Sequence, residues 1–256
     1  MLKNNTLLYV QNLSKTYHDL DGEVKALDHI TFDLVDGEFL SIIGPSGCGK
    51  STILSILSGM DKNYDGQIIG KDNLRVGYML QKDCLLEWKT IYENCLFGLK
   101  VRNEITDENK TYVKNLLEKY GLGDFLDKYP SSLSGGMRQR VALIRTLALK
   151  PDILLLDEPL SALDSKSRME IGNDLYQIIK NEKKTAIMVT HDIGEALSTS
   201  NRIILLTPRP GKIKNIYSFD FHDCSTPDEK RLYEKFPIYL DIVRRDFSWV
   251  KNMNSF

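Results

Sequence analysis

Residues 44–52 have the residue types and spacing of a phosphate-binding loop. They read Gly-Pro-Ser-Gly-Cys-Gly-Lys-Ser-Thr and fit the pattern G-x-x-x-x-G-K-[ST]. The glycines let successive N–H groups point at phosphate oxygens, and the start of the following helix adds partial positive charge. In this pattern Lys50 reaches the β- and γ-phosphates, and Ser51 gives an oxygen to Mg²⁺. We therefore expect a nucleotide site made of Gly44, Pro45, Ser46, Gly47, Cys48, Gly49, Lys50, Ser51 and Thr52.

A pair of carboxylates at the end of an apolar run is the second part of the predicted phosphate site. Residues 153–156 are followed by Asp157 and Glu158, and strand-end carboxylates face the ligand crevice of a parallel sheet. We expect Asp157 to hold Mg²⁺ through water and Glu158 to polarise the attacking water. Two acids at this place are often only a loop start and a helix cap, so the interpretation depends on the phosphate loop upstream.

Short apolar runs predict the α/β fold that positions these motifs. Runs without polar alternation are typical of strands covered on both faces, as in a mostly parallel sheet. Five such runs lie at residues 39–43, 75–80, 153–156, 186–189 and 203–206. Two earlier β-rich pieces, 7–11 and 30–35, are separated by a polar turn at residues 19–22 and predict a small antiparallel β layer.

Helical patterns replace strands between residues 89 and 150. The expected helices are 90–101, 107–120 and 137–149, and in the last of these apolar residues recur at helical spacing. A helix is also expected from residue 51 to 60, directly after the phosphate loop. We expect a helical subdomain of about 89–142 inserted into a domain of residues 1–216, followed by a C-terminal helical extension of residues 217–256.

Composition excludes several classes of protein. The 256 residues are 42% hydrophobic and 27% charged, which is typical of a globular chain. The 34 basic and 35 acidic side chains leave a net charge of -1, so we expect no nucleic-acid partner. No apolar run approaches the roughly 18 residues that span a bilayer, and the first ten residues do not resemble a signal peptide. The four cysteines lack a CxxC spacing, so reduced thiols are expected.

The segment 133–137, Leu-Ser-Gly-Gly-Met, resembles the signature motif of ATP-binding cassette (ABC) ATPases. The resemblance covers about residues 5–215 and implies a P-loop NTPase (RecA-like) fold. In this family two cassettes pair head to tail, and each ATP lies between the phosphate loop of one copy and the signature of the other. Considered alone, the serine is more readily explained as an ordinary helix cap, and the methionine stands where the commonest signature has glutamine. The resemblance implies that the partner's ATP is contacted by Ser134, Gly135, Gly136 and Met137.

Further positions resemble those of the family one at a time. Tyr17 is similar to the aromatic residue that stacks on adenine, and Gln81 to the glutamine that reaches Mg²⁺ and the attacking water. Asp164 closes a segment that resembles the loop crossing the dimer interface. His191 resembles the switch histidine that touches the γ-phosphate and orients Glu158. The resemblance thus implies ATP and Mg²⁺ as cofactors, with Glu158, His191 and Gln81 as catalytic residues and Ser51, Gln81 and Asp157 at the metal.

Residues 78–94 resemble the segment after this glutamine in ATPases of the nitrate/sulfonate/taurine importer group, with Glu87 in place of a typical proline. This resemblance implies an importer subunit at the cytoplasmic face of the cell membrane. Its partners would be a second copy of the chain, two transmembrane permease subunits and, indirectly, an extracellular solute-binding protein. The solute stays open among nitrate, sulfonates, taurine and thiamine-precursor pyrimidines.

Two residues in these motifs carry further expectations. Trp88, with Leu85 and Leu86, predicts an apolar knob that anchors a partner's helix, although packing under the helical subdomain is equally compatible with the sequence. Cys48 lies in the phosphate loop, where a helix N-terminus favours the thiolate, so we expect a reactive thiol.

Other functions stay open at this stage. A soluble ABC ATPase of translation or DNA repair usually has two cassettes or long coiled-coil insertions, which this chain lacks. A non-catalytic ATP-binding scaffold would not need a water-polarising base such as Glu158 or a switch residue such as His191. A GTPase is disfavoured because the sequence contains no N-K-x-D motif.

Overall fold

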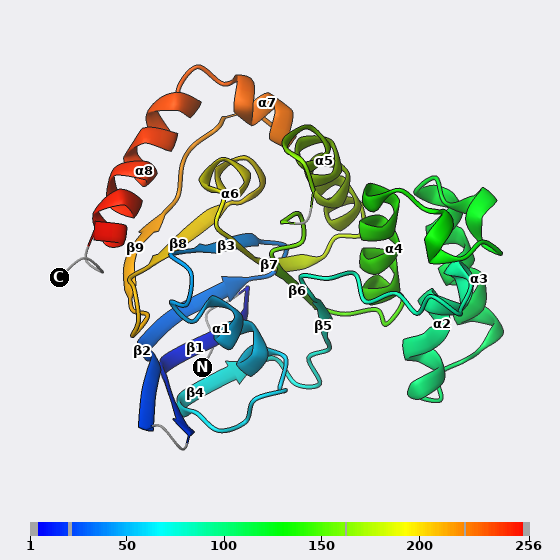
Figure 1. Ribbon diagram of the computed structural model, residues 1–256, viewed down its shortest axis with the longest axis horizontal. Helices are drawn as coiled ribbons and strands as arrows, with labels where there is room; N and C mark the ends of the chain where they lie inside the picture. The colour runs from blue at the N-terminus through cyan, green and yellow to red at the C-terminus, as the bar shows by residue number, and fades with distance from the viewer. Residues whose placement is uncertain (1–4, 20–21, 162, 223, 253–256) are drawn as a thin grey trace.

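The centre of the protein is a six-stranded sheet (Figure 1). The computed structural model describes residues 5–19, 22–161, 163–222 and 224–252. The strand order is β5-β6-β7-β3-β8-β9, and every neighbouring pair is parallel except β8–β9. The strands are β3 (Phe39–Ile43), β5 (Val76–Met79), β6 (Ile153–Asp157), β7 (Thr185–Thr190), β8 (Arg202–Leu206) and β9 (Ile213–Tyr217). The predicted mostly parallel sheet is confirmed.

The apolar runs are continuous because both faces of the sheet are covered. In β6, Leu154 and Leu156 pack into a cluster with the helices of one face, while Ile153 and Leu155 pack with helix α1 (Lys50–Leu57) on the other. All residues of β3, β6 and β7 are buried. A polar residue at any of these positions would lose its contact with water, which explains the missing alternation.

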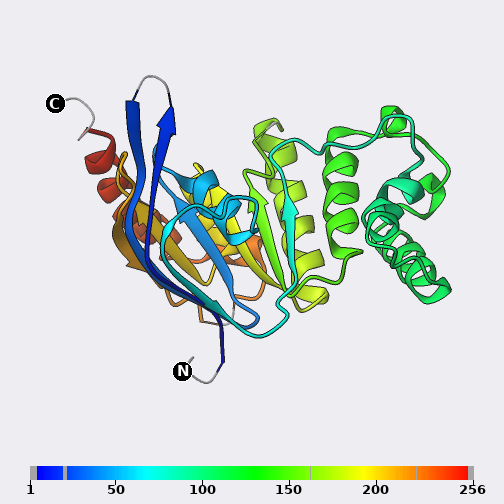
Figure 2. The same ribbon diagram turned by 90° about the horizontal axis from the view of Figure 1, so that it is seen from below.

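An antiparallel sheet covers the α1 side of the central sheet (Figure 2). Its strands are β1 (Thr6–Asp19), β2 (Gly22–Val35) and β4 (Asp65–Gly70), in the order β2-β1-β4. The predicted β layer is present, with longer strands than the sequence indicated, and residues 20 and 21 of the predicted turn lie outside the described residues. Strand β4 was not predicted because most of its side chains are exposed and it has no apolar run.

The helices α1 to α4 begin and end within a few residues of their predicted ranges, whereas α5 and α6 lie in segments for which no helix was predicted. Helix α4 begins two residues before the predicted start because Ser134 caps it, and α2 begins with a capping box of Thr90 and Glu93. Two 3₁₀ turns, Gly123–Phe125 and Pro130–Ser132, lie between α3 and α4. The helices are α2 (Ile91–Val101), α3 (Asp107–Lys119), α4 (Gly135–Leu147), α5 (Ser165–Asn181), α6 (Ile193–Thr199), α7 (Pro227–Leu232) and α8 (Phe236–Asn252).

The C-terminal helices α7 and α8 arch over α6 (Figure 1). Phe236, Val243 and Phe247 share a hydrophobic cluster with α6 and with Ile203 and Leu205 of β8. The extension therefore adds to the core of the cassette, and the division at residue 216 stays a prediction. Among the described residues, none of the helices combines the length and apolarity needed to cross a bilayer.

An arginine on β8 joins the two sheets. The Arg202 guanidinium donates to the carboxylate of Asp33 on β2 (2.9 Å) and to that of Glu38, which lies between β2 and β3 (2.9 Å). Glu38 is buried and also accepts from the N–H of Val35. Since a buried carboxylate needs its partners, the contacts of Arg202 with Asp33 and Glu38 hold the antiparallel layer to the start of β8.

We predict that Arg202→Ala lowers the free energy of unfolding by roughly 2 kcal/mol, between the values for exposed and buried ion pairs. Urea unfolding followed by circular dichroism measures it. Arg245→Ala is the matched control, because Arg245 pairs with Asp241 on the exposed face of α8. Equal stability of the two variants would contradict the prediction.

Candidate nucleotide-binding site

The phosphate loop joins the end of β3 to the start of α1, as expected. Gly49 precedes the helix with φ = 98°, a left-handed conformation that favours glycine. A Cβ on Gly49 would lie 2.5 Å from a side-chain carbon of Leu27, and one on Gly44 would lie 2.8 Å from the sulfur of Cys48. The loop shape therefore requires glycine at both positions.

Lys50 is nearly buried within this loop. Its Nζ donates to the carbonyl oxygens of Gly44 (2.9 Å) and Pro45 (3.0 Å). These contacts hold the ammonium group against the loop, so its positive charge is concentrated beside the first N–H groups of α1.

The expectation of a reactive thiolate at Cys48 is wrong. The side chain is buried, and burial raises the pKa of its thiol even though the charge of Lys50 and backbone N–H groups act in the opposite direction. The helix N-terminus is close, as the sequence indicated. The cost of removing the thiolate from water is larger than the stabilisation that the helix N-terminus and Lys50 provide, so the neutral thiol is favoured.

Asp157 at the end of β6 faces the first turn of α1. Its Oδ1 accepts from the Ser51 hydroxyl (3.1 Å), and its Oδ2 accepts from the hydroxyl of Tyr78 on β5 (3.0 Å). Burial and the adjacent carboxylate raise the pKa of Tyr78, which keeps it a donor. Tyr78 was not predicted to belong to the site, because a tyrosine within an apolar strand carries no signal for such a role. The oxygen donors of Ser51 and Asp157 suit Mg²⁺.

Glu158, Gln81 and His191 meet beside this carboxylate. Glu158 Oε2 lies 3.2 Å from Nδ1 of His191 and 3.5 Å from Nε2 of Gln81. The same Nε2 donates to the hydroxyl of Ser161 (3.2 Å), which itself donates to the Glu158 carbonyl (3.0 Å). The three predicted catalytic residues are thus adjacent, and the amide of Gln81 contacts Glu158 and Ser161.

Tyr17 lies at the other end of the phosphate loop. Its hydroxyl is 3.4 Å from Thr52 Oγ1, and the Nζ of Lys15 lies 4.8 Å from the centroid of its ring. The side chain is 41% exposed. A partly exposed ring at the edge of a phosphate loop is available for stacking.

The signature segment lies apart from the phosphate loop. Ser134 caps α4 by accepting from the N–H of Met137 (3.3 Å), as the simpler interpretation also required. A Cβ on Gly136 would meet Ile171 of α5 at 2.3 Å, so this glycine allows α4 and α5 to pack closely. Figures 1 and 2 both place α4 and α1 in different parts of the molecule. Asp164 is exposed before α5 and accepts from the N–H of Ser167, while residue 162 of the same segment lies outside the described residues.

Of the three residues of the predicted apolar knob, only Trp88 is largely exposed. Trp88 is 74% exposed, whereas Leu85 is buried and Leu86 partly so. Packing of Trp88 beneath the helical subdomain is therefore excluded.

Comparison with known proteins gives the same family as these motifs. The family model described as "ABC transporter" matches residues 27–161. An uncharacterised ABC transporter ATP-binding protein of Bacillus subtilis is 44% identical over 83% of this chain and 84% of its own length. A taurine import ATP-binding protein of a Jannaschia species is 38% identical, covering 93% and 91%. An aliphatic sulfonates import ATP-binding protein of Bacillus cereus is 40% identical, covering 81% and 84%.

Solved structures agree with the sequence comparison. A bacterial ABC transporter cassette solved as a dimer is 31% identical and covers 84% of this chain and all of its own, with a TM-score of 0.70. A dimeric cassette in a post-hydrolysis state, bound to ADP and Pi, matches with a TM-score of 0.69 at the same identity. The chain therefore belongs to the family of ABC transporter ATPase cassettes.

Proposed function

We propose that the chain is the ATP-hydrolysing subunit of an importer for small solutes of the nitrate, sulfonate and taurine type. The observation that carries the proposal is the cluster of Glu158, Gln81 and His191 beside the phosphate loop. Relatives named for taurine and aliphatic sulfonate import support the solute class. A scaffold that only binds ATP needs no such cluster, so the cluster favours hydrolysis.

In this proposal residues 44–52 bind the phosphates of ATP. The N–H groups at the start of α1 and the ammonium group of Lys50 offset the phosphate charge. Ser51 and Asp157 would hold Mg²⁺, which when bound neutralises charge that develops on the phosphate oxygens. The exposed ring of Tyr17 stacks on adenine.

Glu158 polarises the attacking water. His191 orients its carboxylate from 3.2 Å and would also contact the γ-phosphate. Gln81, 3.5 Å from the same carboxylate, would help to hold Mg²⁺ and the attacking water. A carboxylate restricted by two neighbours loses less orientational freedom in the transition state, which lowers the barrier.

The separation of α1 and α4 supports a site shared between two chains. The N-terminus of α4 presents backbone N–H groups suited to an anion. In a head-to-tail dimer Ser134, Gly135, Gly136 and Met137 would contact ATP bound by the other copy, and Asp164 would lie at the contact between the copies. The dimeric cassettes among the solved structures support this arrangement.

A transmembrane permease is the second partner in the proposal. Trp88, Phe97 and Val101 are exposed, and a cavity of about 550 Å³ on α2 is lined by Phe97 together with Lys89, Glu93 and Lys100. Exposed aromatic residues beside a groove are suitable anchors for a partner's helix. Two permease subunits would hold two copies of the chain at the cytoplasmic face of the membrane, and they would receive solute from an extracellular binding protein.

We predict that Glu158→Gln binds ATP and keeps the ATP-dependent dimer, while hydrolysis falls by roughly 10² or more because the amide cannot take a proton from water. Phosphate release and size-exclusion chromatography with ATP are the measurements. Glu170→Gln, on the exposed face of α5, controls for the change of charge. Near-normal turnover in the Glu158 variant would show that another group activates the water.

Trp88→Ala should leave ATP affinity unchanged and weaken the stimulation of ATP hydrolysis by the permease, because the side chain is 74% exposed and free to contact a partner. Nucleotide binding and the hydrolysis rate of the reconstituted complex are compared with those of the original chain. Ile216→Ala controls for the loss of an exposed apolar side chain on another element. A parallel loss of ATP affinity in the Trp88 variant would argue against a docking role.

The buried thiol of Cys48 should make the folded chain resistant to alkylation in the phosphate loop. Iodoacetamide at neutral pH should modify Cys48 at least about tenfold more slowly than the exposed Cys84, since the thiolate is the reactive form. Mass spectrometry of timed digests measures both rates, and the buried Cys95 serves as an internal standard for slow reaction. Equal rates at Cys48 and Cys84 would contradict this expectation.

A further inference from the structure

The loop of residues 81–90, here called the bridging loop, connects the catalytic cluster to the exposed Trp88. Gln81 at its start contacts Glu158 and Ser161. Trp88 near its end is 74% exposed. Any shift of this loop relative to the sheet moves Trp88. The contacts that hold the loop therefore determine whether Trp88 moves with the central sheet or with the neighbouring helices.

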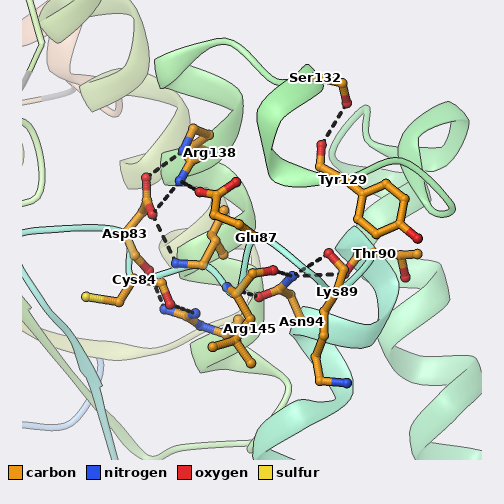
Figure 3. Close-up of polar contacts among 12 residues, drawn as sticks. Asp83, Cys84, Glu87, Lys89, Thr90, Asn94, Tyr129, Ser132, Arg138 and Arg145 are labelled. Carbon is orange, nitrogen blue, oxygen red and sulfur yellow. Dashed lines mark hydrogen bonds and ion pairs between the residues drawn. The ribbon is translucent and has the colours of Figure 1, made fainter.

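An arginine in the first turn of α4 holds the outer part of the bridging loop (Figure 3). Arg138 donates to both carboxylate oxygens of Asp83 (2.7 and 3.0 Å) and to Oε1 of Glu87 (2.7 Å). Two turns later, Arg145 donates to the carbonyl oxygens of Cys84 (2.7 Å) and Asp83. Helix α4 thus contacts both side chains and backbone of the loop. The first of these contacts is made by Arg138, the residue directly after the signature segment.

Helix α2 holds the loop from the other side. The fully buried Asn94 accepts from the N–H of Leu86 (2.8 Å) and donates to the carbonyl oxygens of Leu86 (3.1 Å), Lys89 (3.1 Å) and Thr90 (2.9 Å). Figure 3 shows this amide and the α4 arginines enclosing the loop. Leu85 of the loop belongs to the same hydrophobic cluster as α2 and α4, a cluster that also includes Leu154 and Leu156 of β6, so the loop packs directly with the two helices.

The electrostatics favour the ionic form of the Asp83–Arg138 contact. Burial opposes ionisation of Asp83, yet hydrogen bonds from Arg138 and from the N–H of Leu85 outweigh it and lower the pKa of the carboxyl group. Hydrogen bonds to Asp83 and Glu87 raise the pKa of Arg138. Glu87 is the more exposed acid, with 54% of its side chain accessible. Removing its charge leaves the Asp83–Arg138 pair in place.

The attachment of the loop to the catalytic strand is weaker. There the amide of Gln81 makes contacts of 3.5 and 3.2 Å to Glu158 and Ser161, near the long end of the hydrogen-bond range, without a charged donor. Toward α4, Arg138 makes contacts of 2.7 Å with the charged carboxylates of Asp83 and Glu87. When α4 and the sheet shift relative to one another, the loop therefore follows α4.

We propose that the Arg138–Glu87 ion pair is the contact that makes the tip of the bridging loop move with the signature end of α4, and that Glu87 is a positioning residue for coupling to the partner at Trp88. The inference rests on the proposed function, because ATP bound by a second copy would act at residues 134–137. Glu87 touches no nucleotide in this proposal; it transmits the position of Arg138 to the segment that carries Trp88.

Hydrogen–deuterium exchange of the full-length chain tests the proposal. The parent is the Glu158→Gln variant, with and without Mg²⁺ and ATP, and Glu87→Gln is added to it. In the parent, ATP should slow exchange at residues 135–140 and at residues 82–90. In the Glu87→Gln variant, the slowing at 135–140 should persist, while the slowing at 82–90 should shrink at least about twofold, the size expected for an exposed ion pair.

Glu118→Gln is the matched control, because Glu118 pairs with Lys114 on the exposed face of α3 and loses the same charge in the same set of helices. A merely structural role for Glu87 would raise exchange equally with and without ATP. Glu87→Asp, which keeps the charge, should restore part of the ATP-dependent slowing in the loop.

Size-exclusion chromatography on the same samples separates the inference from the proposed function. If ATP produces no dimer of the parent, the proposed function fails and the inference falls with it. If the dimer forms but residues 82–90 respond equally in the parent and in Glu87→Gln, or do not respond in the parent, the inference is overturned while the proposed function stands.

Discussion

The phosphate loop keeps its shape because neighbouring segments approach it more closely than side chains would allow. Gly49 has a left-handed backbone against a side chain of β2, and a Cβ on Gly211 would come within 2.1 Å of the Cys48 carbonyl oxygen. Two backbone hydrogen bonds of 2.9 Å, from Asp28 to Gly211 and from Gly211 to Ala26, fix the distance between β2 and the turn after β8. Both sheets must therefore be in place for the loop to present its N–H groups, and contacts such as those of Arg202 belong to the site indirectly.

The order of the parallel strands then assembles the rest of the site. The neighbours β5, β6, β7 and β3 all end at the same edge, and the residues at or after their ends are Gln81, Asp157, His191 and Gly44. The register pairs Asp157 with Val189 and Ile43 with Thr190, so groups far apart along the chain become neighbours. No single loop could hold these groups at contacts of 3.0 to 3.5 Å, because loop backbone is more mobile than paired strands.

The sequence predicted the parts of this arrangement that depend on local chemistry. The apolar strands and the phosphate loop have patterns that can be recognised within ten residues, and the predicted partners Glu158, Gln81 and His191 do meet. Strands β4 and β9 were missed because their exposed side chains give no apolar run; each lies at the edge of its sheet. The prediction of a reactive thiol at Cys48 was wrong because burial depends on segments distant in the sequence, whereas the helix N-terminus could be recognised locally.

Contacts along the path from the nucleotide site to Trp88 differ in strength: they are strong at both ends and weaker at Gln81. The sheet edge is held by backbone pairing, and the bridging loop is held to α2 and α4 by the buried Asn94 and by charged contacts of Arg138. Between the sheet edge and this loop lie the longer contacts of the neutral Gln81 amide. A hinge requires one flexible junction between two rigid parts. If the whole path were flexible, a movement at one end would not reach the other. A glutamine suits the junction because its amide can exchange partners without leaving an unpaired charge. A member of the catalytic cluster is thus also the point at which the loop separates from the catalytic strand.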